Sequence, residues 1–95
     1  MIVIQCTGFF EAGDAVRNLV HDVHIPLFLI VGVRSYFASR QGASADNCPR
    51  FTEPLMKAWD IPYALLDDRH TAKDLGRVYR QHRADRRAGA VLIAE

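Results

Sequence analysis

The sequence predicts an α/β protein built on an open parallel sheet of about four strands with flanking helices. Four short apolar runs, rich in β-branched residues, recur along the chain at residues 1–4, 27–33, 63–66 and 90–94. Segments with helical periodicity separate most of these runs. Strands joined through a helix in this way favour parallel pairing with a right-handed crossover.

The first twenty residues contain the clearest strand–helix unit. Residues 1–4 form a continuous apolar run, which is typical of a strand buried on both faces. Gly8 interrupts the run, so we expect a turn there and a helix from Glu11 onward. The apolar face of that helix recurs at steps of three and four residues, at Ala12, Ala15, Val16, Leu19, Val20 and Val23.

The remaining strands and helices are predicted from turn-forming and capping residues and from the spacing of apolar residues. We expect the second strand at residues 27–33 and a long loop at residues 34–49, a length that is usually functional or mobile. Thr52 is expected to cap a short helix with Pro54 in its first turn and an inner face of Leu55, Met56 and Trp59. The third strand is expected at residues 63–66.

The last helix carries the strongest start signal of the chain. Thr71 and Asp74 have the spacing of a capping box, with Asp in place of the more usual Glu. Gly89 is expected to end the helix before the fourth strand. The predicted buried side comprises Ala72, Leu75, Tyr79 and His82.

Composition indicates which partners and which cellular setting to expect. The 95 residues are 49% hydrophobic with a net charge of +1, so neither nucleic acid nor an anionic membrane is an expected partner. The longest apolar stretch is too short to span a bilayer. Two cysteines make no disulfide framework, which favours a reduced, cytoplasmic setting. Because the chain starts inside a core strand, we expect it to be an N-terminally truncated single domain or one piece of an assembly.

Candidate binding residues follow the first two strands, where ligands bind in open α/β sheets. Gln5, Thr7 and Gly8 offer an amide, a hydroxyl and an accessible backbone, although they can equally form the turn and cap the helix. Phe9 and its neighbour can wall an apolar slot, or pack in the core or an interface. Arg34 can clamp an anionic group, or be solvated or paired with an acid such as Asp46.

Other clusters have simpler structural explanations. Residues 67–70 (Asp-Asp-Arg-His) can be an acid/base cluster, but acids before a helix favour capping. His21 and His24 lack further ligands for a metal site. Cys6 is interpreted as a small buried hydrophobe and Cys48 as a loop thiol. The basic last helix is interpreted as a solvated face, with nucleic-acid binding or docking of an acidic partner as alternatives; its arginines are Arg77, Arg80, Arg83, Arg86 and Arg87.

Taken in order, several motifs resemble the pyrimidine-binding domain of thiamine-diphosphate-dependent enzymes, most closely that of sulfopyruvate and phosphonopyruvate decarboxylases. The resemblance covers nearly the whole chain but only about the second half of a family domain, which has a flavodoxin-like fold. It is carried by Gln5-Cys-Thr-Gly8, Ile25-Pro-Leu27, Gly32-Val-Arg34, Thr52 to Leu55, Asp60-Ile-Pro-Tyr63 and Gly89 to Glu95.

The resemblance implies a part in 2-oxo acid decarboxylation, as the pyrimidine side of an intersubunit site. Cofactor contacts are then expected at Gln5, Thr7, Gly8 and Phe9, and substrate contacts at Arg34 and Asn47. The implied cofactor is thiamine diphosphate, with Mg²⁺ held by a partner domain. The implied partners are a diphosphate-binding subunit or domain and a small 2-oxo acid substrate, in an oligomer.

The chain departs from the family pattern in ways that affect catalysis. The glutamate that activates the cofactor in the family lies upstream of Met1, and Glu11, Glu53 and Glu95 do not match its context. We therefore expect no catalytic residue in this chain. The alternative hypothesis is a non-catalytic α/β interaction module or a remnant subunit.

Overall fold

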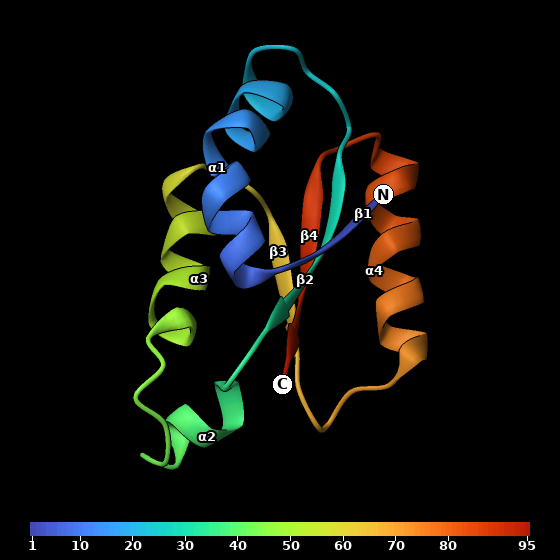
Figure 1. The fold of residues 1–95 in the computed structure, drawn as a ribbon. Coiled ribbons are helices and arrows are strands. Elements are labelled where there is room, and N and C mark those ends of the chain that lie inside the picture. Colours follow the sequence, from blue (N-terminus) through green and yellow to red (C-terminus); the bar gives the residue numbers. More distant parts are fainter.

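The computed structural model describes every residue from Met1 to Glu95 and confirms the predicted α/β class (Figure 1). Four parallel strands form one sheet in the order β1-β2-β4-β3. The strands are β1 (Ile2–Gln5), β2 (Phe28–Val33), β3 (Tyr63–Leu66) and β4 (Gly89–Ala94). The helices are α1 (Cys6–His21), α2 (Tyr36–Arg40), α3 (Cys48–Ala58) and α4 (Ala72–Asp85).

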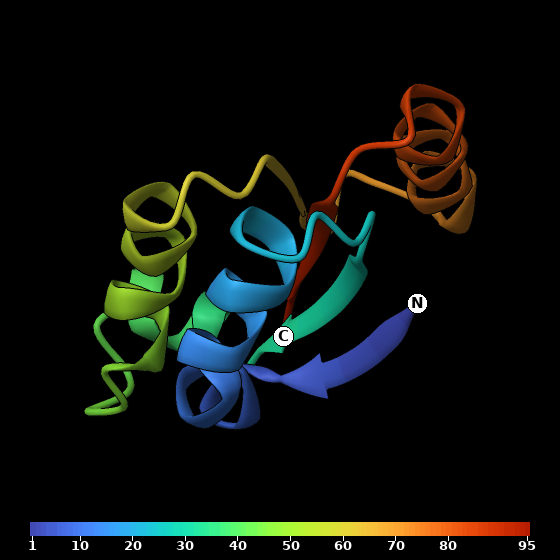
Figure 2. The same ribbon diagram turned by 90° about the horizontal axis from the view of Figure 1, so that it is seen from above.

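The two faces of the sheet are covered unequally. Helices α1 and α3 lie on one face, and α4 alone lies on the other (Figures 1 and 2). The larger core fills the α1/α3 side and contains Cys6, Phe9, Val16, Leu29, Val31, Val33, Cys48, Met56, Ile61, Ala90 and Leu92. The core beneath α4 has only three fully buried members, Phe28, Leu66 and Val91.

Strand β1 corrects the expectation that the first apolar run is buried on both faces. It is an edge strand that pairs only with β2. Met1 remains 71% exposed and Val3 73% exposed. Helix α4 packs over β3 and β4, near the edge of the sheet that is opposite to β1. One face of β1 is therefore left open. An apolar run predicts a strand, but it does not reveal whether a covering layer is present.

Helix α1 begins five residues earlier than predicted. No turn intervenes at Gly8, because the helix starts at Cys6, directly after β1. Its buried positions are Cys6, Phe9, Gly13 and Val16, so the apolar periodicity extends back to the first helical residue. Gly8 lies within the helix, and a side chain there would meet Ile4 of β1.

The predicted loop at residues 34–49 is correct only in part. It contains the short helix α2, and α3 begins at Cys48 instead of after Thr52. Thr52 lies inside α3, 1% exposed, and donates its hydroxyl to the Cys48 carbonyl at 2.8 Å. Pro49 occupies the first turn of α3, where a missing N–H is harmless, while Pro54 lies within the helix.

The capping box that begins α4 is confirmed. The Thr71 hydroxyl accepts from the Lys73 N–H at 3.3 Å, and the Asp74 carboxylate accepts from the Thr71 N–H at 2.8 Å. The helix ends with Arg86 in the left-handed region, at φ 51°. Ala72 is exposed, contrary to the prediction, whereas the other predicted inner residues are half-buried: Leu75, Tyr79 and His82.

Candidate functional site at the carboxyl edge of the sheet

The carboxyl ends of the parallel strands bring polar groups from distant parts of the chain to one edge. Gln5 ends β1, Arg34 follows β2, Asp67 follows β3 and Glu95 follows β4. Gln5 and Gly32 are partners in the β1–β2 register, and the Glu95 carboxylate lies against Gly32, where a side chain would displace it. The structure thus places Glu95 at this edge, a position that the sequence motifs did not suggest.

Arg34 is held by an acid from the segment before α3. Its Nε donates to Asp46 Oδ2 at 2.8 Å, and the Ser35 hydroxyl donates to the same oxygen at 3.1 Å. Asp46 Oδ1 accepts the Cys48 N–H at 3.0 Å. That backbone bond, followed by the Arg34 bond, holds the pKa of Asp46 well below its usual value. The alternative in which Arg34 pairs with Asp46 is therefore the observed one.

The pairing leaves part of the Arg34 guanidinium free. Only its Nε is hydrogen-bonded, and the side chain is 44% exposed. The two Nη groups can therefore still donate to a planar anion such as a carboxylate, sulfonate or phosphonate. Asp46 orients the group and offsets part of its charge.

The N-terminus of α1 follows β1 directly and has no side-chain cap. Gln5 is the N-cap residue, and its side chain makes no capping bond. The Thr7 hydroxyl approaches Gln5 Oε1 at 3.5 Å, which is a weak contact. The first N–H groups of the helix therefore receive no side-chain acceptor from Gln5, and Cys6 at the first helical position is itself buried. Phe9 is 0% exposed and lies in the core, away from this surface.

Asn47 completes the predicted set and lies on the same side of the molecule. It is exposed at the N-cap of α3, and its side chain makes no capping bond. Because the adjacent Asp46 bonds Arg34, the N-terminus of α3 lies next to the end of β2. The structure therefore brings Gln5, Thr7, Gly8, Arg34 and Asn47 to one edge.

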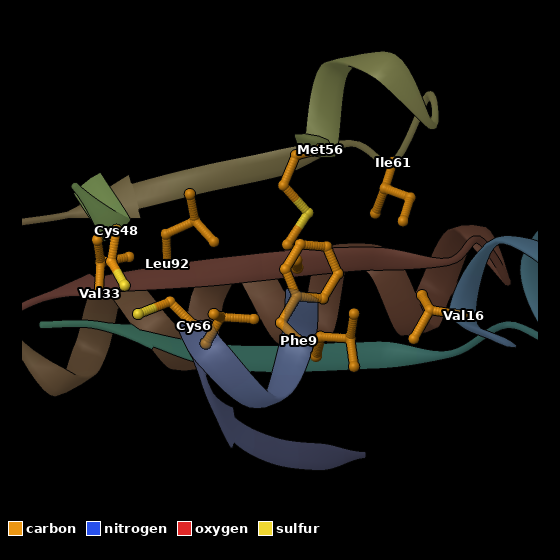
Figure 3. Packing of buried hydrophobic residues seen from close by; sticks show 11 residues of the cluster. Cys6, Phe9, Val16, Val33, Cys48, Met56, Ile61 and Leu92 are labelled. Atoms are coloured by element: carbon orange, nitrogen blue, oxygen red, sulfur yellow. The ribbon is translucent and has the colours of Figure 1, made fainter. Parts of the chain in front are cut away.

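Cys6 and Cys48 meet in the core behind this edge, each at the first position of a helix (Figure 3). Both are reduced and buried, so the interpretation of Cys48 as a loop thiol is wrong. Burial, followed by the bond to Asp46, raises the pKa of Cys48 to about 11. A thiol with that pKa is almost entirely protonated at neutral pH, which argues against a nucleophilic role.

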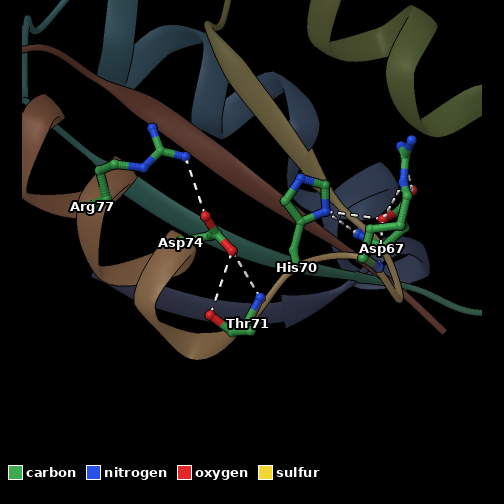
Figure 4. Close-up of polar contacts among 6 residues, drawn as sticks. Asp67, His70, Thr71, Asp74 and Arg77 are labelled. Atoms are coloured by element: carbon green, nitrogen blue, oxygen red, sulfur yellow. Dashed lines mark hydrogen bonds and ion pairs between the residues drawn. The ribbon is translucent and has the colours of Figure 1, made fainter.

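The residues after β3 form a structural turn (Figure 4). The Asp67 side chain is 6% exposed and pairs with Arg69 Nη2 at 2.9 Å, while His70 Nδ1 lies 2.9 Å from Asp67 Oδ1. The Arg69 bonds, from side chain and then backbone, hold the pKa of Asp67 well below its usual value. With both partners engaged in shaping the turn, the geometry favours the structural explanation over acid/base chemistry.

Concave surface and metal ligands are sparse at this edge. A hollow of about 300 Å³ is lined by Phe37, Arg40, Gln41 and Asp68. No group of three or more His, Cys, Asp or Glu side chains is placed to hold a metal ion. His21 instead bonds the Trp59 carbonyl, which ties the end of α1 to the end of α3.

Comparisons with known proteins add no relative. No protein-family model, curated protein or solved structure matches the chain. No helix of the chain combines the length and apolarity needed to cross a membrane.

Proposed function

We propose that this chain contributes the pyrimidine side of an intersubunit active site in a thiamine-diphosphate-dependent 2-oxo acid decarboxylase of the sulfopyruvate or phosphonopyruvate kind. The observation that carries the proposal is the carboxyl edge. There, the uncapped N-terminus of α1 follows β1, and a partly free Arg34 follows β2. Ligands of open α/β sheets bind at such an edge.

The groups around β1 suit a flat, polar heterocycle better than a metal or a sugar. The Gln5 amide both donates and accepts, and the first N–H groups of α1 are left without a side-chain cap. Gly8 lets the first turn of the helix pack closely against Ile4 of β1. Phe9, buried behind the helix, would fix the position of the helix end without touching the ligand.

The cofactor, when bound, supplies the electron sink for decarboxylation. The chain's own residues would bind the cofactor and the substrate and orient them. Its glutamates are engaged or placed elsewhere: Glu11 is exposed on α1, Glu53 accepts from the Tyr63 hydroxyl at 2.8 Å, and Glu95 lies against Gly32. The activating carboxylate and the diphosphate site must therefore come from other segments.

Arg34 is the proposed ligand for the anionic tail of the substrate. Asp46 holds its Nε, so the guanidinium plane is oriented before the substrate arrives. Binding through the Nη groups would be bidentate, and Lys could not reproduce that geometry. Asn47, exposed nearby, can donate an amide hydrogen to the same tail.

The test is calorimetric titration of thiamine diphosphate with Mg²⁺, together with 2-oxo acid turnover. The chain is tested alone, mixed with the diphosphate-binding subunit of a sulfopyruvate decarboxylase, and mixed after fusion to an N-terminal segment that supplies the family glutamate. We expect binding and turnover only in the last mixture. Tight cofactor binding by the chain alone would contradict the proposal.

Substitution of Arg34 separates a substrate role from a structural one. In the active mixture, Arg34→Ala should raise KM for 2-oxo acids with an anionic tail by about 10- to 100-fold, because a charge-assisted pair is lost. Cofactor affinity should stay unchanged. Arg80→Ala is the matched control, since Arg80 is exposed on α4, away from this edge, and is not ion-paired.

The non-catalytic interaction module is retained as a second proposal because of one observation. Strand β1 has a free edge and an open face that carry Met1 and Val3, each more than 70% exposed. Exposed edge strands of this kind pair or pack with other chains. If the mixtures associate but neither bind cofactor nor turn over, this function is favoured.

A further inference from the structure

The open face of the sheet carries an apolar row that runs under α4 at one end and out to solvent at the other. Val3, Ile30 and Val91 are register partners on β1, β2 and β4, so their side chains lie on the same face. Val91 is buried beneath α4, Ile30 is half-buried, and Val3 is 73% exposed. Met1, two residues before Val3, shares that face. We call Met1, Val3 and Ile30 the open strip.

A groove of about 380 Å³ adjoins the open strip at the amino ends of the strands. One wall comes from Met1, before β1, and from the start of β2 with the proline that precedes it, and the other comes from the C-terminal half of α4 and the residues that follow it. Its floor is apolar and aromatic, with the Phe28 and Tyr79 rings 5.1 Å apart. The lining residues are Met1, Pro26, Phe28, Tyr79, His82, Arg83, Arg86 and Arg87.

The arginines of this groove have no acidic partners. Arg83 only approaches the Tyr79 hydroxyl, at 3.4 Å, and Arg86 and Arg87 form no ion pair or side-chain hydrogen bond. No Asp or Glu lines the groove. Outside the groove, Arg17, Arg34, Arg69 and Arg77 each pair with an Asp, whereas Arg40, Arg50 and Arg80 are unpaired but do not share a groove with another arginine.

Because the net charge of the chain is only +1, the basic groove is a local arrangement and not a consequence of general basicity. Three exposed arginines around one groove create a local positive potential that favours an anionic partner, although Asp60 lines a neighbouring hollow with Arg86 and Arg87. The open strip likewise exposes apolar surface that a covering layer would bury. The two features lie side by side and call for one partner that is both apolar and acidic.

We propose that the open strip and the basic groove bind an amphipathic α-helix of a partner protein, with an apolar face toward Val3 and Ile30 and an acidic flank toward Arg83, Arg86 and Arg87. A helix is about 10 Å across, which suits a layer beside α4 on the same face of the sheet. A strand added to the edge of β1 would leave the strip uncovered. A nucleic acid would satisfy the arginines but not the aliphatic strip.

The test uses a panel of synthetic helical peptides of about five turns, each with a leucine face and a flank of glutamates. Fluorescence anisotropy measures their binding to the full chain. We expect saturable binding that weakens as salt rises, because the acidic flank meets exposed arginines. Peptides with lysine in place of glutamate, and scrambled peptides of the same composition, should bind at least about tenfold more weakly.

Two sets of variants test the contributions of the basic groove and of the open strip separately. Arg83→Glu with Arg86→Glu should weaken binding by about tenfold or more through charge reversal. Arg80→Glu, on α4 but outside the groove, should stay within about twofold. Val3→Asp should weaken binding through the strip, whereas Phe51→Asp, an exposed apolar position on α3, should not. Circular dichroism establishes that each variant is folded.

Several results would overturn the proposal. They are the absence of saturable binding across the panel, equal binding of the lysine peptides, or no response to the groove variants. Duplex or single-stranded oligonucleotides that bind more tightly than every acidic peptide would assign the groove to nucleic acid instead. Sedimentation that shows a dimer, returned to monomer by Val3→Asp, would assign the strip to a second copy of this chain.

Discussion

The two faces of this sheet share the same strands but are covered by helices to different extents. On the α1/α3 face, eleven residues are buried in one core, and their side chains come from both helices, from β2 and β4 and from the segment before β3 (Figure 3). On the α4 face, only three residues are fully buried, and β1 and part of β2 are left open. The first face holds the fold together, and the second is available for binding.

The largest difference should appear when a core side chain is truncated on each face. Phe9 is 0% exposed, and its ring lies 5.8 Å from that of Trp59, so Phe9→Ala should lower the free energy of unfolding by about 3–5 kcal/mol. Leu75 of α4 is only half-buried, so Leu75→Ala should cost less than half as much. Urea denaturation measures both. Equal losses would contradict the unequal division of the core.

Glycines on the two faces should respond with opposite signs to the same substitution. A methyl group at Gly13 of α1 would collide with the Trp59 ring, which is wedged between helices, so Gly13→Ala should destabilise by about 1–3 kcal/mol. At Gly76 of α4 the nearest atom is the end of the flexible Arg80 side chain, 3.0 Å away. There, the better helix propensity of alanine should stabilise by about 0.5–1 kcal/mol. Thermal unfolding of the two variants distinguishes the signs.

The turn that positions α4 should make stability depend on pH in acid. The folded-state pKa of Asp67 is depressed, chiefly by Arg69, below the ordinary value of 3.8. Its contribution is therefore fully present above that value and is lost as pH falls through and below it. Melting temperatures of the wild type and Asp67→Asn should differ at pH 6 and converge toward pH 2. Asp68→Asn, an exposed neighbour, should track the wild type at every pH.

Features that depend on residues adjacent in sequence were predicted more accurately than features that depend on contacts between distant segments. The capping box at Thr71 and the strand at residues 63–66 were predicted correctly, because both depend on residues adjacent in sequence. The start of α1 was missed because Gly8 was interpreted as a turn, although a glycine packed against Ile4 is tolerated inside a helix. The start of α3 was missed because Asn47 and Pro49 were interpreted as loop residues, although they are the N-cap residue and a first-turn proline.

In the candidate site, too, local features were predicted and features that depend on distant elements were missed. The strand ends predicted that Gln5 and Arg34 lie at one edge, since parallel strands align their carboxyl ends. The basic groove depends on where α4 lies over the sheet, so sequence alone did not separate Arg83 from Arg80. The exposure of Val3 likewise depends on a layer that is not adjacent in sequence.

The smallest effect is expected for the pair of thiols in the well-packed face. Burial raises the pKa of Cys48 to about 11, and Cys6 is 0% exposed beside it. Iodoacetamide should therefore modify neither cysteine of the folded chain at pH 8 at a measurable rate, and both after unfolding in urea, as mass spectrometry would show. Modification of either thiol without denaturant would mean that the ends of α1 and α3 open locally. Because the carboxyl-edge site is built on those two helix ends, such opening would mean that the proposed cofactor site is locally unstable before a ligand binds.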